Sequence, residues 1–152
     1  MFLVDDTLEK RQAYIKRQLK YDPILAVFLA AADFEWTIRR AILALGRNPT
    51  KYIREEVLGN CSGLKAYKDA WKKEAKPICG DNLADVVPDW QFFKEAYKLR
   101  HRLIHGVIGT TGNYYATVRV NAILAASKSI ADYASSKNEP LFGRKIIRRK
   151  PR

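Results

Sequence analysis

The chain has 152 residues, of which 47% are hydrophobic, and this composition argues against an intrinsically disordered protein. Its two cysteines, Cys61 and Cys79, form no CxxC or Cys/His pattern, which disfavours a disulfide scaffold or a structural zinc site and favours a reducing, cytoplasmic location. No apolar run is long enough to cross a bilayer, and the formal net charge of +12 favours a polyanionic partner, nucleic acid before an acidic membrane.

Helical periodicity and helix-end signals run through the chain, and no credible strand alternation interrupts them. The expected helices begin, in order, after Asp6, at Pro23, at Asn48-Pro49, after Ser62, at Pro88 and at about Tyr114. The helix from Pro23 is expected to run to Leu45, and Pro77 is expected to close the one after Ser62. We expect loops at 78–87 and 109–113. The pattern predicts an all-α fold, a single-domain bundle of five or six helices over residues 1–142, with a basic tail at 143–152.

Two groups of cations are candidate RNA-binding surfaces. The first is a line of lysines along the helix after Ser62: Lys65, Lys68, Lys72 and Lys76. The second is in the tail, which carries six positive charges and no negative one: Arg144, Lys145, Arg148, Arg149 and Lys150, with Arg152 at the end. A lysine face is also the ordinary solvated side of a surface helix, so both interpretations of the first group stay open.

The chemically distinctive stretch is Tyr97–Gly106, which contains both histidines of the chain, His101 and His105. At about 100° per residue, Arg100 points into an apolar arc and the two histidines project side by side on its flank. The arc consists of Phe92, Phe93, Ala96, Tyr97, Leu99, Leu103 and Ile104. A guanidinium there is costly to desolvate unless it meets an anion, so we expect Glu35, Glu95, a subunit interface or an anionic ligand beside it.

Other chemistries lack their motifs. Two histidines one turn apart resemble half of a metal site, but no third ligand pattern accompanies them, so we expect no metal and no cofactor. There is no GxSxG elbow for Ser/His/Asp hydrolysis, and neither glycine pattern of a Rossmann or P-loop nucleotide site occurs. A purely structural use of Arg100 and the histidines remains open.

The string Leu-Arg-His-Arg-Leu-Ile-His-Gly, Leu99–Gly106, resembles the motif of HEPN domains, in which a histidine follows an arginine after a few residues. It is similar to the LRNxxxHG form common in HEPN ribonucleases of toxin and phage-defence systems. The surrounding pattern agrees, because the motif closes a late helix that a long helix follows. The helix that carries Glu35 also resembles the acid-bearing early helix of such domains.

The resemblance implies a HEPN-like homodimer that acts on RNA as a metal-independent endoribonuclease without a cofactor, with Arg100 and His105 as the matching motif residues. His101 occupies the position where asparagine is more usual, and its role stays open between orienting the site and transferring a second proton. Glu35 is the supporting acid. Such a protein is expected to be a toxin or abortive-infection effector, with a cognate antitoxin protein as partner.

The residues suit this chemistry by themselves. RNA supplies the 2′-hydroxyl nucleophile, histidine moves protons near neutral pH, and a guanidinium stabilises charge on the phosphate. Arg100 and His105 lie about 140° apart on an ideal helix, so they converge only if the helix end unwinds at Gly106 or a second subunit completes the site. Two alternatives remain: a non-catalytic HEPN-like module that binds RNA or nucleotide, and a basic helical DNA-binding or assembly protein.

Overall fold

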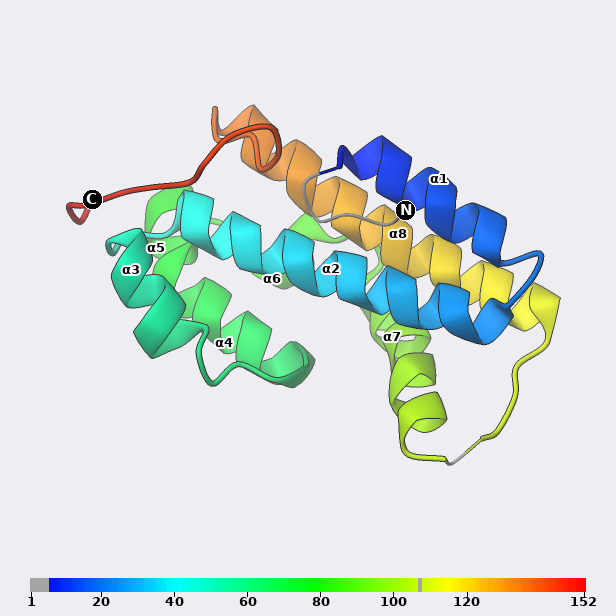
Figure 1. Cartoon of the computed structure of the whole chain (residues 1–152). Coiled ribbons are helices and arrows are strands. Elements are labelled where there is room, and N and C mark those ends of the chain that lie inside the picture. The colour runs from blue at the N-terminus through cyan, green and yellow to red at the C-terminus, as the bar shows by residue number, and fades with distance from the viewer. Residues whose placement is uncertain (1–5, 107) are drawn as a thin grey trace. The chain divides into compact units, whose positions relative to one another are not determined.

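The computed structural model describes residues 6–106 and 108–152, and every regular element in them is helical (Figure 1). The α-helices are α1 (Leu8–Gln18), α2 (Pro23–Leu45), α3 (Thr50–Tyr52), α4 (Gly63–Glu74), α5 (Lys76–Cys79), α6 (Leu83–Val86), α7 (Trp90–Ile104) and α8 (Asn113–Ser136). A π-helical turn, η1 (Ile53–Val57), continues α3. The prediction of an all-α fold is confirmed, and no helix of the described chain is long and apolar enough to span a membrane.

The predicted number of helices is wrong, because the described residues form eight α-helices rather than five or six. Two of the additional helices, α5 and α6, fall at or beside the stretch predicted as a loop. Pro77 does not stop helical structure there, since it sits in the first turn of α5, where its missing N–H costs no hydrogen bond. Asn82 and Asp85 form a capping box that starts α6.

The chain divides into two compact units, and α2 and α8 each contribute to both. The first unit comprises residues up to Trp36 together with Asp89–Lys128, and the second comprises Thr37–Pro88 together with Ser129–Arg152. The predicted division into a domain over residues 1–142 and a tail stays a prediction. The tail segment itself belongs to the second unit.

In the first unit, an aromatic cluster packs α7 against α2. The ring centroid of Phe34 lies 4.7 Å from that of Phe93 and 5.6 Å from that of Tyr97, and Phe34 and Phe93 are almost completely buried. Pairs of this kind contribute about 0.5–1.5 kcal/mol each beyond the burial of their area. The cluster fixes the position of Glu35, which follows Phe34 on α2, relative to Arg100, which lies about one turn after Tyr97 on α7.

The first helix of this unit begins differently from the prediction, with Thr7 rather than Asp6 as its cap. The Thr7 hydroxyl accepts a hydrogen bond from the backbone N–H of Lys10 at 3.3 Å. Further along α1, Arg11 Nε donates to Asp33 Oδ1 at 2.6 Å, and neither side chain is exposed. Burial raises the pKa of Asp33, and the Arg11 guanidinium partly offsets that effect.

In the second unit, Trp71 and Glu74 of α4 are fully buried. The indole Nε1 of Trp71 donates to the Asp81 carbonyl at 2.9 Å, and Asn48 Nδ2 donates to Glu74 Oε1 at 2.8 Å. The C-terminal segment, residues 143–152, lies beside the chain that follows α2 (Figure 1), with the backbone N–H of Thr50 donating to the Arg148 carbonyl at 2.9 Å. Specific hydrogen bonds therefore hold α4 and the C-terminal segment in this unit.

Candidate active site

Helix α7 presents the motif residues at its C-terminal end. Asp89 caps the beginning of α7 by accepting from the backbone N–H of Phe92 at 3.2 Å. The helix ends at Ile104, so His105 is already outside regular helix, and Gly106 follows with φ 66°. This left-handed conformation is the one that glycine adopts at helix ends. The predicted end of the helix is confirmed to within two residues.

Arg100 meets one of its two expected carboxylates. Its Nη2 lies 3.7 Å from Glu35 Oε1, too long for a hydrogen bond but within the range of an ion pair, and the same oxygen accepts from the Tyr97 hydroxyl at 2.7 Å. The other candidate, Glu95, pairs with Lys98 at 2.9 Å, and this hydrogen bond is the main reason that the pKa of Glu95 lies below its usual value. The expectation of an acid beside Arg100 is confirmed for Glu35.

Arg100 lines an open hollow of about 300 Å³, at the lower end of the range for ligand pockets. The residues that line it are Phe28, Ala32, Glu35, Arg100 and Ile104. The side chains of Arg100 and Glu35 are 33% and 27% exposed, so both remain accessible to a ligand. The apolar arc of α7 is buried only in part, since Phe92 and Ile104 are about half exposed. A cation, an acid and apolar surface thus meet at one accessible place.

The two histidines form a separate pair. Their ring centroids lie 4.2 Å apart, both residues are exposed, and neither lines the hollow beside Arg100. Within the described residues, neither histidine makes an ion pair or a side-chain hydrogen bond with Arg100. The structure therefore groups Arg100 with Glu35, and His101 with His105, as two sets on one helix.

The lysine line along α4 is only partly brought together. Lys68, Lys72 and Lys76 line a hollow of about 430 Å³ that also contains Asp69 and Asp85. Lys65 lies outside that hollow and pairs with Asp69 at 3.1 Å, with both side chains largely exposed. Three of the four predicted lysines therefore line one hollow, together with two carboxylates.

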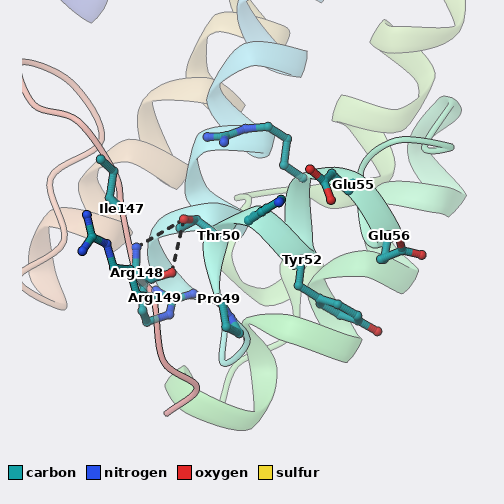
Figure 2. A pocket seen from close by; sticks show the side chains of 10 residues that line it. Pro49, Thr50, Tyr52, Glu55, Glu56, Ile147, Arg148 and Arg149 are labelled. Atoms are coloured by element: carbon teal, nitrogen blue, oxygen red, sulfur yellow. Dashed lines mark hydrogen bonds between the residues drawn. The ribbon is translucent and has the colours of Figure 1, made fainter.

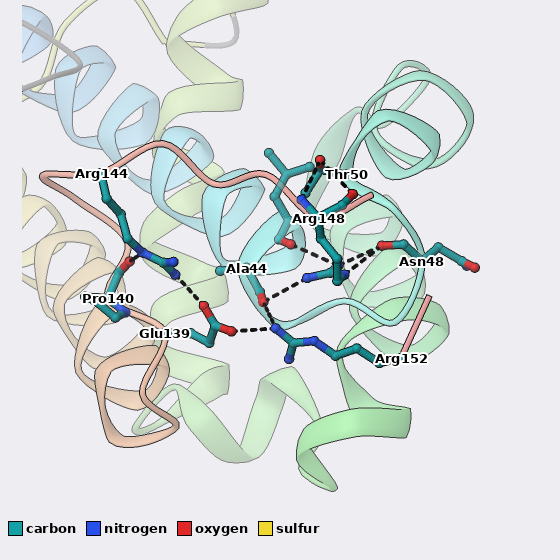
Figure 3. Close-up of polar contacts among 9 residues, drawn as sticks. Ala44, Asn48, Thr50, Glu139, Pro140, Arg144, Arg148 and Arg152 are labelled. Carbon is teal, nitrogen blue, oxygen red and sulfur yellow. Dashed lines mark hydrogen bonds and ion pairs between the residues drawn. The ribbon is translucent and has the colours of Figure 1, made fainter. Parts of the chain in front are cut away.

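The basic residues of the C-terminal segment have different surroundings. Arg148 donates to the carbonyls of Leu43, Ala44 and Asn48, the shortest of these bonds being 2.7 Å from Nη2 to Asn48 (Figure 3). Burial lowers the pKa of Arg148. An RNA contact by this guanidinium would require these bonds to break.

Arg144 is also engaged within the protein, because it pairs with Glu139 and its Nε donates to the Pro140 carbonyl at 2.7 Å (Figure 3). The remaining predicted cations of the segment, Lys145, Arg149 and Lys150, are exposed. Of the predicted RNA-binding cations of this segment, these three are the ones whose side chains make no hydrogen bond or ion pair in the described structure.

A larger hollow, of about 790 Å³, was not predicted from the sequence. It lies between the C-terminal segment and the turn formed by α3 and η1 (Figure 2). The sequence feature that could have indicated this hollow is an aromatic residue between cations, in the string Lys51-Tyr52-Ile53-Arg54. The other wall, at residues 147–149, comes from a segment that only the tertiary fold brings there.

Within the described residues, no group of three or more His, Cys, Asp or Glu side chains is arranged to hold a metal ion, and both thiols are free. No protein-family model, no curated protein and no solved structure matches the chain.

Proposed function

We propose that the chain is a metal-independent endoribonuclease of the HEPN type, with Arg100 and His105 as its catalytic residues. The observation that carries the proposal is the ion pair of Arg100 with Glu35 at the edge of an accessible hollow. An arginine whose guanidinium pairs with an acid and whose side chain is still one-third exposed is suited to bind the scissile phosphate. The histidine pair at the end of the same helix supplies side chains that can donate and accept protons.

In the proposed reaction, the 2′-oxygen of a ribose attacks the adjacent phosphorus. A P–O2′ bond forms, the P–O5′ bond breaks, and the products are a 2′,3′-cyclic phosphate and a free 5′-hydroxyl. His105 moves a proton during this step, either from the 2′-hydroxyl or to the departing 5′-oxygen, and Arg100 stabilises the charge on the phosphate oxygens. Glu35 acts as a positioning residue, because it contacts Arg100 and not the reacting atoms.

The separation of the two sets of residues supports a homodimer as the active form. Since His105 does not line the hollow of Arg100, a second chain is the simplest source of the missing proton-transfer group. Two exposed apolar side chains, Ile104 in the lining of the hollow and Leu25 on α2, offer surface for such a contact. We propose that each site takes Arg100 from one chain and His105 from the other.

The HEPN ribonucleases that the motif resembles occur in toxin and phage-defence systems. We therefore also propose that the chain is a cytoplasmic effector and that a cognate antitoxin protein restrains it. Under this proposal, expression of the chain slows growth, and the His105→Ala chain does not. Equal growth of the two strains at equal protein levels would argue against the effector role.

The experiment that tests the reaction uses metal-free protein in EDTA with two labelled substrates, an RNA and the same sequence with 2′-O-methyl riboses. Cleavage of the RNA alone, with 2′,3′-cyclic phosphate at the new ends, is the expected result. Cleavage of the methylated substrate, or 3′-hydroxyl ends, would require a nucleophile other than the 2′-hydroxyl and would refute the mechanism.

A second function, RNA or nucleotide binding without cleavage, is favoured by the same separation of Arg100 from the histidines. In a monomer, Arg100 and Glu35 could hold a phosphate with no proton-transfer group beside it. Salt-sensitive RNA binding without any cleavage would support this alternative.

A further inference from the structure

The hollow of about 790 Å³ in the second unit is distinct from the Arg100 site and has two walls. One wall is the turn formed by α3 and η1, which contributes Lys51, Tyr52 and Arg54, and the other is the C-terminal segment at Ile147, Arg148 and Arg149 (Figure 2). Its size lies well within the range of ligand pockets. Nothing in the proposed cleavage reaction uses it.

The two walls are joined by specific bonds. The Thr50 N–H donates to the Arg148 carbonyl at 2.9 Å, and the Arg148 N–H donates to Thr50 Oγ1 at 3.2 Å (Figure 2). The Arg148 guanidinium is bonded to the carbonyls at the end of α2 and beyond it. The hollow is therefore part of the folded structure, and no conformational change is needed to form it.

Three cations of the walls are available to an anion. Lys51, Arg54 and Arg149 are exposed, and within the described structure none of them makes a hydrogen bond or an ion pair. Two carboxylates, Glu55 and Glu56, also lie on the lining. Because these would repel a long continuous polyanion, the hollow suits a ligand with few charges at defined places.

The lining also offers surface for a flat apolar group. Tyr52 is 40% exposed, and its ring points outward from the turn, away from the C-terminal segment (Figure 2). Ile147, in that segment, is 67% exposed. Lys73 Nζ lies 5.6 Å from the Tyr52 ring centroid and 3.5 Å from its hydroxyl, which adds a further cation beside the ring. An aromatic ring among cations is the combination that binds the bases and phosphates of single-stranded nucleic acid.

We propose that this hollow binds a short single-stranded segment of RNA, with a base against the Tyr52 ring and phosphates of the segment at Lys51, Arg54 and Arg149. The choice of RNA over other polyanions rests on the proposed function. A duplex is disfavoured, because its bases are already stacked on one another and cannot lie against the Tyr52 ring.

The test is fluorescence anisotropy with a labelled single-stranded RNA of about eight nucleotides, which is within the usual site size for such grooves. The full chain carries His105→Ala, so that the probe stays intact during the titration. In this background Tyr52→Ala is expected to weaken binding about tenfold, and Tyr52→Phe, which keeps the ring, is expected to bind within about twofold of the parent.

Arg149→Gln gives a second, independent readout, because this exposed side chain makes no contact that folding requires. It is expected to weaken binding and to reduce the magnitude of the log–log salt slope by about 0.7, the value for one phosphate contact to a single strand. Lys20→Gln is the control, since it removes an exposed cation that does not line the hollow and belongs to neither group of candidate RNA-binding cations. The control is expected to bind like the parent.

Binding by Tyr52→Ala and Arg149→Gln equal to that of the parent, with both variants folded, would overturn the proposal. An equal loss in Lys20→Gln would also overturn it, because the effect would then be one of overall charge. The same RNA annealed to its complement is expected to bind more weakly, and Tyr52→Ala is expected to leave the affinity for this duplex unchanged. If Tyr52→Ala weakens duplex binding as much as single-strand binding, base stacking on Tyr52 is excluded.

The outcome is separable from that of the cleavage proposal. If the hollow variants lose affinity for RNA but the wild-type chain cuts no RNA in EDTA, the nuclease is refuted and the binding site stands. Cleavage by the wild-type chain with unchanged affinity in the hollow variants refutes only the binding site.

Discussion

The Nη2 atom of Arg100 lies 3.7 Å from Oε1 of Glu35, and the Tyr97 hydroxyl donates to that same oxygen at 2.7 Å. Glu35 and Tyr97 both adjoin the aromatic cluster, since Phe34 precedes Glu35 and Tyr97 packs on Phe34 at 5.6 Å. The orientation of the guanidinium is thus linked to the packed core of the first unit, while its outer face remains open to the hollow.

Glu35→Gln is expected to lower the rate of RNA cleavage about tenfold with little change in stability. The amide oxygen still accepts from Tyr97, but the charge that holds Arg100 is lost, and partly exposed ion pairs contribute only about 0–1 kcal/mol to stability. Initial rates and thermal unfolding midpoints measure the two effects. Glu95→Gln, which breaks the exposed pair with Lys98, is the control and should leave the rate unchanged.

A mixture of Arg100→Ala and His105→Ala chains is expected to recover activity that neither variant has alone. If each site combines Arg100 of one chain with His105 of the other, a mixed dimer contains one intact site. Random assembly of equal amounts then gives about a quarter of the wild-type rate. A mixture no more active than the sum of its parts would show that both residues act within one chain.

Arg148→Ala is expected to destabilise the protein by roughly 2 kcal/mol, because carbonyls at the end of α2 lose charged donors that solvent does not fully replace. Urea unfolding measures this free energy. Arg149→Ala removes the neighbouring cation, which is exposed, and should change it by no more than about 0.5 kcal/mol. Equal effects of the two substitutions would contradict the structural role of Arg148.

Glu139 should make stability depend on pH in the acid range. Burial raises its pKa, but hydrogen bonds from Arg144 and Arg152 outweigh this effect, and the pKa in the folded state lies below the usual value. A lowered pKa contributes stability that is present above the ordinary glutamate pKa of about 4.3 and is lost as the pH falls through the folded-state value. Thermal midpoints of Glu139→Gln should therefore fall less steeply than wild type below about pH 4.

Periodicity was sufficient for the long helices. The predicted bounds of α2, Pro23–Leu45, agree with the structure, and the residues of α8 expected to face inward are all fully buried: Ala116, Val120, Ile123, Ile130 and Ala134. An apolar stripe of several turns leaves a helix only one face to bury, so sequence alone determines the outcome. The need for an acid beside Arg100 followed from the same argument.

Features that depend on tertiary structure were not predictable. The short helices α5 and α6 have too few residues to show periodicity, and Pro77 and Asn82 carry loop signals as readily as helix-start signals. The charge of the C-terminal segment suggested a basic surface, and sequence could not show that the Arg148 guanidinium meets carbonyls more than a hundred positions away. The hollow at Tyr52 was not predictable for the same reason, because its second wall comes from residues 147–149, which only the tertiary fold brings close to Tyr52.

The rate of RNA cleavage in EDTA by wild-type and Arg100→Ala chains, purified in parallel and matched in folded content, tests the central claim most directly. The account predicts cleavage by the wild type and a loss of at least about a hundredfold in the variant, because the variant lacks the group that stabilises charge on the phosphate. Equal rates would assign the activity to something other than the Arg100 site, and a wild type that leaves RNA intact would contradict the nuclease.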